Sequence, residues 1–345
     1  MTHEHGGNIS QIENILDFSA NINPLGVPES VKVAVRDNLG SIEKYPDPYC
    51  SELRSRLAIH EKMPAENIVC GSGADDLIFR IVHALRPRRA LICAPTFSEY
   101  RKALEEVGCE IREHILTESS GFTMTDSLIE ELDENYDICF VCTPNNPTGK
   151  LITADILKKL ADKCRERNTI LVCDECFLGF VQDGAAFSLR RCINESSIIL
   201  KAFTKLYAMA GIRLGYVVCG SSAAAERIQN SGQFWSVSAL AQAAGIAALA
   251  EDDYVRRTIS LIAAEREFLT AELSSLGVVI CPSAANFLLF KSTAGLAEKM
   301  LSEGILIRDC SNFNGLSDGY YRIAVRTHDE NVRLLDSLEI GRAHV

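Results

Sequence analysis

The sequence predicts an α/β fold, with a mostly parallel seven-stranded sheet in a large domain and a smaller α+β domain after it. Three observations lead to this prediction. Seven short apolar runs alternate with helical patterns across residues 66–219. A long segment with helical spacing of its apolar residues, 253–276, follows them and precedes further short strands. The chain has 345 residues, which is too many for one simple core and fits two compact lobes.

The seven apolar runs are interpreted as strands that are buried on both faces, because they are continuous rather than alternating in polarity. They are, in order, ENIVC, ALICAP, CEIREHIL, DICFVCTP, TILVCDE, SSIILKAF and IRLGYVVC. Helical patterns at residues 75–85, 99–107 and 154–167 separate several of them. Strands that alternate with helices predict a mostly parallel sheet with helices on both faces.

The domain boundaries follow from this order of elements. Residues 40–240 form the large domain. Residues 241–339 supply a linking helix and the small C-terminal domain, to which the N-terminal segment 1–39 also contributes. The last residues, 340–345 (IGRAHV), do not continue the amphipathic pattern before them and are interpreted as a non-native tail.

The charge balance narrows the class of partner. The formal net charge is −11, which argues against a nucleic acid or an anionic membrane. The N-terminus lacks an apolar signal segment, and no apolar run is long enough to span a bilayer. We therefore expect a cytoplasmic protein that binds neither nucleic acid nor membrane. A small anionic substrate remains compatible, because a few convergent arginines suffice to bind one.

The thirteen cysteines raise the question of a metal site. Two Cys-x-x-Cys pairs occur, Cys139 with Cys142 and Cys173 with Cys176, and a zinc site is the alternative to consider. Both pairs lie in apolar runs that read as strands, where residues three apart point to opposite faces. We therefore expect reduced thiols and no metal.

Two residues carry the first sign of chemistry. Lys205 follows one of the buried strands and precedes a segment of small residues, and Asp174 ends another strand. A partly desolvated lysine can form a Schiff base with an aldehyde cofactor, whereas a lone lysine is otherwise a solvated surface residue. A carboxylate at the end of an apolar strand needs a partner, and a helix N-cap is the plain alternative.

Two loops add to this pattern. Residues 71–76 (GSGADD) connect a strand to a helix, and glycines before a helix N-terminus favour binding of an anion. Residues 143–149 (TPNNPTG) follow a strand directly, and a plain turn would use the same residue types. The glycine loop lacks the third glycine of a dinucleotide site and the lysine of a P-loop.

In combination these strings carry a family resemblance. The order GSGADD, PTFSEY, PNNPTG, CDECF, TK and GIRLGY resembles the class I and II aminotransferases, which have the fold-type-I architecture and use pyridoxal 5′-phosphate (PLP). The resemblance implies that Lys205 forms the Schiff base, Asp174 pairs with the ring nitrogen, Asn146 bonds the ring 3′-oxygen and Phe97 stacks on the ring.

The same resemblance implies the phosphate site and the assembly. The residues expected around the cofactor phosphate are Gly73, Ala74, Asp75, Thr204 and Arg213. Tyr45 is expected to reach the phosphate of a neighbouring subunit's cofactor, which implies a homodimer with shared active sites.

Two positions depart from the family pattern. Phe177 stands where relatives often have a tyrosine that bonds the 3′-oxygen, so the pKa of the lysine–cofactor Schiff base should be higher than with tyrosine. Ala202 stands where many relatives have a serine or threonine that bonds the phosphate, so either Thr204 compensates or the cofactor is held by fewer bonds.

The ends of the chain narrow the resemblance further. The strings HGGN and DFSANINPLG, at residues 5–8 and 17–26, resemble the L-threonine-O-3-phosphate decarboxylases of cobalamin biosynthesis. This family converts L-threonine O-3-phosphate to (R)-1-aminopropan-2-ol O-2-phosphate. Arg326 lies where the aminotransferase branch commonly has a small residue. The resemblance implies that Arg322 binds the substrate carboxylate and that Arg308, His5 and Asn21 hold the substrate phosphate. Gly26 is also expected among the substrate-binding residues.

Three rival functions stay open at this point. Histidinol-phosphate aminotransferase uses the same scaffold but depends on 2-oxoglutarate. Preference for serine phosphate differs by one methyl group, which is worth only about 1–3 kcal/mol of discrimination. A non-catalytic PLP-sensing regulator would need a basic DNA-binding segment, which the sequence does not contain.

Overall fold

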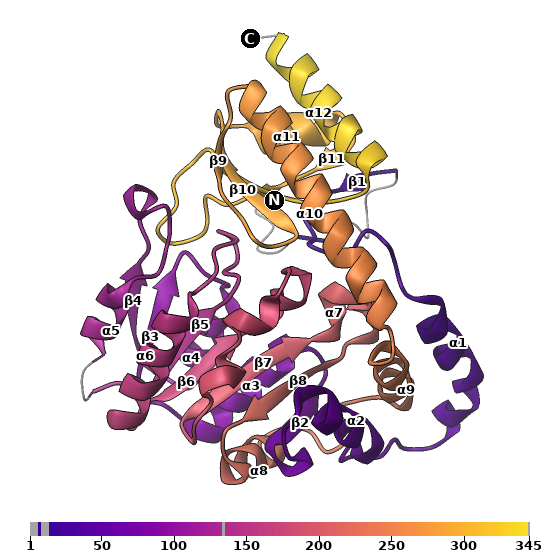
Figure 1. Ribbon diagram of the computed structural model, residues 1–345, viewed down its shortest axis with the longest axis vertical. Coiled ribbons are helices and arrows are strands. Elements are labelled where there is room, and N and C mark those ends of the chain that lie inside the picture. Colours follow the sequence, from indigo (N-terminus) through magenta and orange to yellow (C-terminus); the bar gives the residue numbers. More distant parts are fainter. Residues whose placement is uncertain (1–5, 8–13, 133–134, 344–345) are drawn as a thin grey trace.

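The computed structural model describes residues 6–7, 14–132 and 135–343. A large lobe is built around a seven-stranded sheet, a smaller lobe contains the C-terminal strands, and α10 (Asp252–Ser275) runs between them (Figure 1). The order of the strands in the large sheet is β2-β8-β7-β6-β5-β3-β4. The predicted α/β fold with a seven-stranded sheet is thereby confirmed.

All seven predicted strands are present in the large sheet. They are β2 (Ile68–Gly71), β3 (Arg89–Ala94), β4 (Glu110–Ile115), β5 (Ile138–Cys142), β6 (Ile170–Asp174), β7 (Ser197–Ala202) and β8 (Gly215–Cys219). β8 is antiparallel to both of its neighbours, and all the other pairs are parallel. The carboxyl ends of β3, β5, β6 and β7 therefore meet at one edge, where open α/β sheets bind their ligands.

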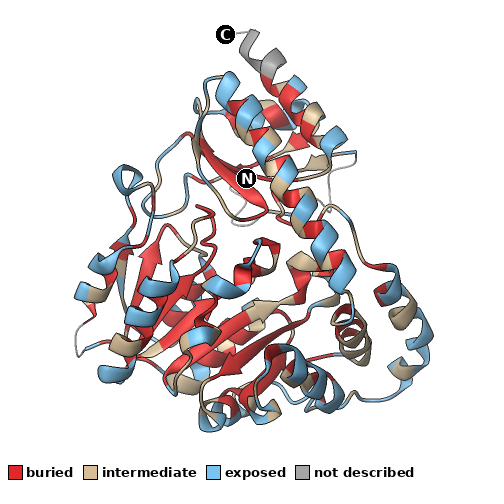
Figure 2. Cartoon of the chain, in the orientation of Figure 1, coloured by how far each residue is buried: buried red, intermediate tan, exposed pale blue. Residues whose placement is uncertain are grey.

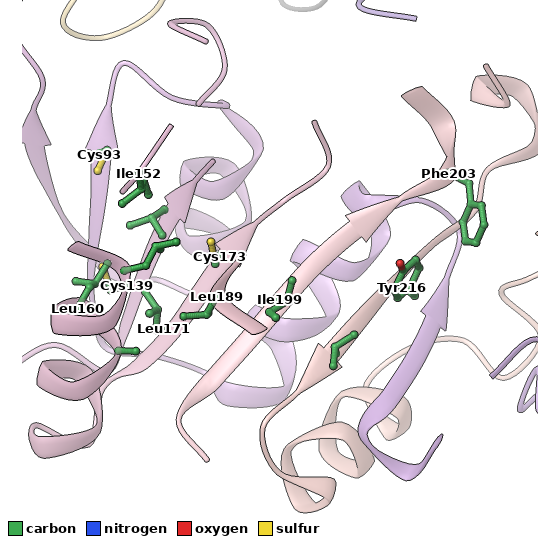
Figure 3. Packing of buried hydrophobic residues seen from close by; sticks show 14 of the residues in the cluster. Cys93, Cys139, Ile152, Leu160, Leu171, Cys173, Leu189, Ile199, Phe203 and Tyr216 are labelled. Carbon is green, nitrogen blue, oxygen red and sulfur yellow. The ribbon is translucent and has the colours of Figure 1, made fainter. Parts of the chain in front are cut away.

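Helices cover both faces of the sheet because successive strand residues point to opposite sides. On β6, Leu171 and Cys173 face a core shared with Leu160, whereas Val172 faces the opposite core, which contains Leu77. Figure 3 shows part of the first core, with Cys139 and Cys173 packed among aliphatic side chains. Figure 2 shows the central strands of the large sheet as almost entirely buried. Cys139, Cys142 and Cys173 thus belong to sheet strands, as the apolar runs predicted, whereas Cys176 lies just beyond the end of β6. β4 lies at the edge of the large sheet and is mostly half-buried or exposed, so the prediction of burial on both faces is wrong for this strand.

The three helical patterns predicted within the sheet region agree, to within one residue at their ends, with α3 (Ala74–Leu85), α4 (Glu99–Glu106) and α6 (Ala154–Glu166). The start of α6 shows why: the Thr153 hydroxyl accepts the backbone N–H of Ile156 at 3.4 Å, so the helix begins at its cap. The large lobe also contains α2 (Ser51–Glu61), α5 (Asp126–Glu131), α7 (Phe203–Leu206), α8 (Ser222–Asn230) and α9 (Ala239–Ala248).

The small lobe contains a four-stranded antiparallel sheet of order β12-β13-β10-β9 and a two-stranded parallel pair, β1 with β11. Its strands are β1 (Leu16–Asp17), β9 (Val279–Cys281), β10 (Phe287–Lys291), β11 (Ile305–Leu306), β12 (Arg308–Asp309) and β13 (Tyr320–Ala324). Its helices are α11 (Leu296–Ser302) and α12 (His328–Ala343). The N-terminal β1 therefore lies beside C-terminal strands.

The remaining N-terminal helix, α1 (Glu29–Asp37), packs instead against α9. The exact boundaries between the domains stay a prediction. Backbone helix continues through residues 340–343, and the interpretation of 340–345 as a non-native tail also stays a prediction. Within the described ranges, no helix is both long and apolar enough to cross a membrane.

Candidate active site

A cavity of about 500 Å³ lies at the carboxyl ends of β5, β6 and β7 and extends to the small lobe. This size suits a cofactor together with a small substrate. Most residues that the sequence predicted for the site line this one cavity. They are Asn21, Ala74, Asp75, Phe97, Asn146, Asp174, Thr204, Lys205, Arg213, Arg308 and Arg322. Residues separated by about three hundred positions thus meet in one place.

Four predicted residues lie elsewhere or cannot be placed. Gly73 sits just behind the lining, at the start of α3. Gly26 is in a turn with φ +72°, and its carbonyl accepts the Tyr254 hydroxyl at 2.7 Å. Tyr45 is 79% exposed and lies outside the cavity of its own chain. His5 lies outside the described residues.

Lys205 has the electrostatics of a reactive amine. It lies on α7, directly after β7, and its backbone carbonyl accepts the N–H of Asn23 at 3.1 Å. Burial, with the nearby guanidinium groups of Arg322 and Arg213, lowers the pKa of Lys205 to about 8. A larger fraction of this amine is therefore neutral near pH 7 than for an ordinary lysine, as Schiff-base formation requires.

Asp174 is the last residue of β6 and is 5% exposed. Its two oxygens receive separate hydrogen bonds, from the backbone N–H of Cys176 to Oδ1 at 2.9 Å and from the Tyr100 hydroxyl to Oδ2 at 2.6 Å. Burial raises the pKa of Asp174, and hydrogen bonds from the Cys176 thiol, the Tyr100 hydroxyl and the Cys176 backbone N–H oppose that rise. A carboxylate held in this way can pair with a positively charged group in the cavity.

The start of α3 forms an anion-binding end of the cavity. Gly73 precedes the helix with φ +94°, and a Cβ at this position would lie 2.8 Å from Nη2 of Arg213. Glycine is therefore needed for the backbone conformation, and a Cβ here would displace the Arg213 guanidinium. The amide groups of Ala74 and Asp75 in the first turn, together with Arg213 and the buried Thr204, could hold a phosphate.

The opposite end of the cavity contains two buried arginines. Arg308 on β12 and Arg322 on β13 are directly opposite each other in the antiparallel register. They are 7% and 6% exposed, and like charges in this arrangement repel. Burial, with the charge of Arg308, lowers the pKa of Arg322 to about 10. Its Nε is buried and has no hydrogen-bond partner among the described residues. This end of the cavity is suited to an anion.

Asn146 connects the two ends of the site. Its Oδ1 accepts a hydrogen bond from Nη1 of Arg322. The amide nitrogen remains as the donor, which is the group that a ring oxygen would need. Phe177 also lines the cavity, and it lacks the hydroxyl that a tyrosine would place there. Its ring packs edge-on against Phe287, with the ring centroids 5.0 Å apart.

The N-terminal segment closes one wall of the cavity through Ser19. The Ser19 hydroxyl donates to Oδ1 of Asp17 at 2.6 Å and accepts the backbone N–H of Gly7 at 2.8 Å. The Ser19 carbonyl accepts Nη2 of Arg322 at 2.8 Å. Arg326 donates to the Asp17 carbonyl at 2.9 Å, so it supports this segment from behind. Ser19 thus links the glycine-rich start of the chain to Arg322.

Several lining residues were not selected from the sequence. They are Gly6, Ser19, Ala20, Ser98, Glu99, Tyr100, Lys102, Cys142, Cys176 and Phe313. For Tyr100 the available signal was its place in PTFSEY, three residues after the predicted stacking residue. For Ser19 the signal was its place in DFSANINPLG, where only the asparagine and the glycine were chosen.

The residues present fit PLP. The reactive amine of Lys205 lies in the same cavity as a buried carboxylate suited to a pyridine nitrogen and a phosphate cradle at a helix start. Across the described part of the chain, no three or more His, Cys, Asp or Glu side chains are arranged to hold a metal ion.

Comparison with known proteins agrees with this geometry. Residues 13–338 match the family model described as aminotransferase class I and II. The chain is 40% identical to the threonine-phosphate decarboxylase of Salmonella typhimurium over 97% of this chain and 95% of the relative. It is 32% identical to the histidinol-phosphate aminotransferase of Symbiobacterium thermophilum, over 95% and 91% respectively.

The structural comparison gives the same fold. The crystal structure of the histidinol-phosphate aminotransferase from Clostridium acetobutylicum matches with a TM-score of 0.90 and 28% identity, over 96% of this chain and all of the other. The resemblance to threonine-phosphate decarboxylases that the N-terminal strings predicted is confirmed by the sequence comparison. The chain belongs to the class I and II aminotransferase family and is a PLP-dependent enzyme.

Proposed function

We propose that this enzyme decarboxylates L-threonine O-3-phosphate to (R)-1-aminopropan-2-ol O-2-phosphate and CO2, a step of cobalamin biosynthesis. The observation that carries the proposal is the pair of buried arginines opposite the reactive lysine, which fits a substrate with two anionic groups. The higher identity to a threonine-phosphate decarboxylase than to a histidinol-phosphate aminotransferase supports the reaction type.

The large lobe would hold the cofactor. Lys205 would bind it covalently, Asp174 would keep its ring nitrogen protonated, and Asn146 would donate to its 3′-oxygen. Phe97 would stack on the ring, and the phosphate would lie against the start of α3, with Arg213. When bound, PLP supplies an electron sink that weakens the bonds at the substrate Cα.

The small lobe would hold the substrate. Arg322 would bind the α-carboxylate, and Arg308 with Asn21 would bind the phosphate, to which His5 would also contribute. The orientation of the substrate decides which Cα bond breaks, and two arginines at fixed positions provide that orientation. When the bond to the carboxylate breaks, CO2 leaves with both of its oxygens, and Cα takes up one proton.

Lys205 would return that proton. Its amine lines the same cavity as the arginines that would bind the substrate. A pKa of about 8 allows this amine to take up a proton from solvent and to give it up again near neutral pH. Ser19 and its neighbours in the N-terminal segment would form a wall of the cavity that limits the access of water.

We further propose a homodimer in which Tyr45 completes the partner's site. Tyr45 stacks on Trp235, with ring centroids 4.4 Å apart, and Tyr49 and Phe234 extend the group. All four aromatic side chains are about half exposed or more, which suits a surface covered by a second copy. A Lys205→Ala protein and a Tyr45→Ala protein, each inactive alone, should regain activity when mixed and refolded together. If the mixture stays inactive although affinity tags verify that mixed dimers have formed, the shared site is refuted.

Product analysis tests the reaction. The purified enzyme with PLP and L-threonine O-3-phosphate, without any keto acid, should release CO2 and aminopropanol phosphate in equal amounts. Lys205→Ala should release neither. Amino transfer from histidinol phosphate to 2-oxoglutarate without release of CO2 would replace this proposal by the aminotransferase reaction. Serine O-phosphate in place of the threonine compound measures the substrate preference.

A further inference from the structure

Tyr100 is buried between the two groups that would contact the cofactor ring. It lies in the first turn of α4, and its side chain has no exposed surface. Its hydroxyl donates to Oδ2 of Asp174 at 2.6 Å. Its ring stacks on Phe140, with centroids 5.1 Å apart, and meets the Phe97 ring edge-on at 5.7 Å. One side chain therefore contacts both the stacking residue and the acidic residue.

The hydrogen bonds of Asp174 come from two directions. Cys176 supplies its backbone N–H to Oδ1 and also its thiol, and Tyr100 supplies its hydroxyl to Oδ2. The carboxylate also lines the cavity, so its remaining lone pairs are available to a ligand there. A buried carboxylate takes up a proton readily unless donors stabilise its charge. The Tyr100 hydroxyl is such a donor, and burial together with Asp174 raises the pKa of this phenol, so it stays protonated.

We propose that Tyr100 is a positioning residue that acts through Asp174 on the cofactor's ring nitrogen. Its hydroxyl keeps Asp174 ionised and fixes the plane of the carboxylate, so that the proton of the ion pair stays on the ring nitrogen. Its ring also limits the position of Phe97. The inference rests on the proposed placement of Asp174 opposite that nitrogen, and it does not depend on which substrate the enzyme uses.

The chain offers a matched control for loss of a buried tyrosine hydroxyl. Tyr216 is also buried and donates to a buried carboxylate, Oε1 of Glu61, at 2.6 Å. Neither Tyr216 nor Glu61 lines the main cavity. Tyr216→Phe therefore removes the same kind of bond, and any loss of stability that comes with it, without touching the proposed site.

The experiment measures binding of pyridoxamine 5′-phosphate to the full-length apo-enzyme by calorimetry. This compound cannot form a Schiff base with Lys205, so its affinity reports the non-covalent contacts alone. The variants are Tyr100→Phe, Tyr216→Phe and Asp174→Asn. Each is also tested with the deaza analogue, in which carbon replaces the ring nitrogen, and the protonation state is measured by NMR on ligand labelled with ¹⁵N in the ring.

In Tyr100→Phe the dissociation constant should rise roughly tenfold, the factor expected for one charge-assisted hydrogen bond. The deaza analogue should bind wild type and Tyr100→Phe equally. The ¹⁵N resonance should move from the position of a protonated pyridine toward that of the free base. Tyr216→Phe should show none of these changes. If Tyr100→Phe does not fold, difluorotyrosine at position 100 strengthens the donor and should shift affinity in the opposite direction.

Three results would overturn the inference. An equal loss of affinity for both ligands in Tyr100→Phe would mean that the side chain acts only through the shape of the cavity. If Asp174→Asn loses affinity only for the ligand that contains the ring nitrogen, and Tyr100→Phe loses none, the role of Tyr100 is refuted and that of Asp174 is kept. If neither variant loses affinity in a way that depends on the ring nitrogen, the placement of Asp174 opposite that nitrogen is refuted as well. The proposed decarboxylation would not be affected by that result.

Discussion

Replacement of Arg322 by methionine separates a functional role of this buried charge from a structural one. Arg322 lies opposite Arg308 across two strands, and its guanidinium lies 5.5 Å from the centre of the Phe287 ring. Methionine has a similar length and packs well against an aromatic ring, but it carries no charge and donates no hydrogen bond. The substitution therefore removes the repulsion and the anion site together.

The free-energy cost of burying the Arg322 charge follows from the pKa of this side chain. Burial and the charge of Arg308 hold the pKa of Arg322 at about 10, against an ordinary value of 12.5. At about 1.4 kcal/mol for each tenfold change in proton affinity, the charged form costs the folded state roughly 3 kcal/mol. The folded-state pKa is the lower one, so this cost is present at every pH below about 10. The two hydrogen bonds of Arg322, to Ser19 and Asn146, offset it by about 1 kcal/mol each.

The free energy of unfolding of the Arg322→Met apo-enzyme should therefore stay within about 1 kcal/mol of wild type, as measured by urea denaturation. The KM for L-threonine O-3-phosphate should rise roughly 100-fold or more, because a buried charge partner of the substrate is lost. Arg326→Met is the control, because Arg326 has a carboxylate partner, Oε1 of Glu330, at 2.6 Å. It should lower the stability by about 1–3 kcal/mol. A loss of more than about 3 kcal/mol in Arg322→Met, the size expected when a structural charge pair is broken, would refute the reasoning.

Three further predictions concern the cofactor and the N-terminal segment. The amine of Lys205 in the apo-enzyme should titrate near pH 8, measured by NMR of the dimethylated lysine, and since its folded-state pKa is lowered, its contribution to stability should rise between pH 8 and 10.5. Gly73→Ala places a Cβ 2.8 Å from Arg213 at φ +94°, so affinity for PLP should fall roughly tenfold or more while affinity for unphosphorylated pyridoxal changes little. Ser19→Ala removes the bond to Asp17, so KM should rise roughly tenfold with little change in kcat, and Ser19→Thr should restore it.

The large lobe and the cofactor residues were predictable because their signals are local. Asp174 ends an apolar run, and Asn146 and Lys205 lie in the short segments after two others. The carboxyl ends of neighbouring parallel strands necessarily meet at one edge. The glycine loop before α3 has the residue types that an anion site at a helix start requires. These residues line one cavity in the structure.

The supporting interactions could not be predicted because they depend on contacts between distant segments. The pairing of Arg308 with Arg322 is set by the register of β12 and β13, which no local pattern specifies. Tyr100 contacts Asp174 across 74 positions of the sequence, and its place in PTFSEY does not specify that contact. The role expected for Tyr45 depends on a second chain and stays a prediction.

The most direct test of the central claim is the reaction in D2O. The enzyme with PLP and L-threonine O-3-phosphate, and no keto acid, is allowed to turn over many times, and the products are analysed by mass spectrometry and NMR. Cleavage of the bond to the carboxylate predicts one CO2 per aminopropanol phosphate, and one deuterium on the carbon that carried the carboxylate. Recovered threonine phosphate with deuterium at Cα, and no CO2, would show that the enzyme breaks the C–H bond instead and would contradict the account.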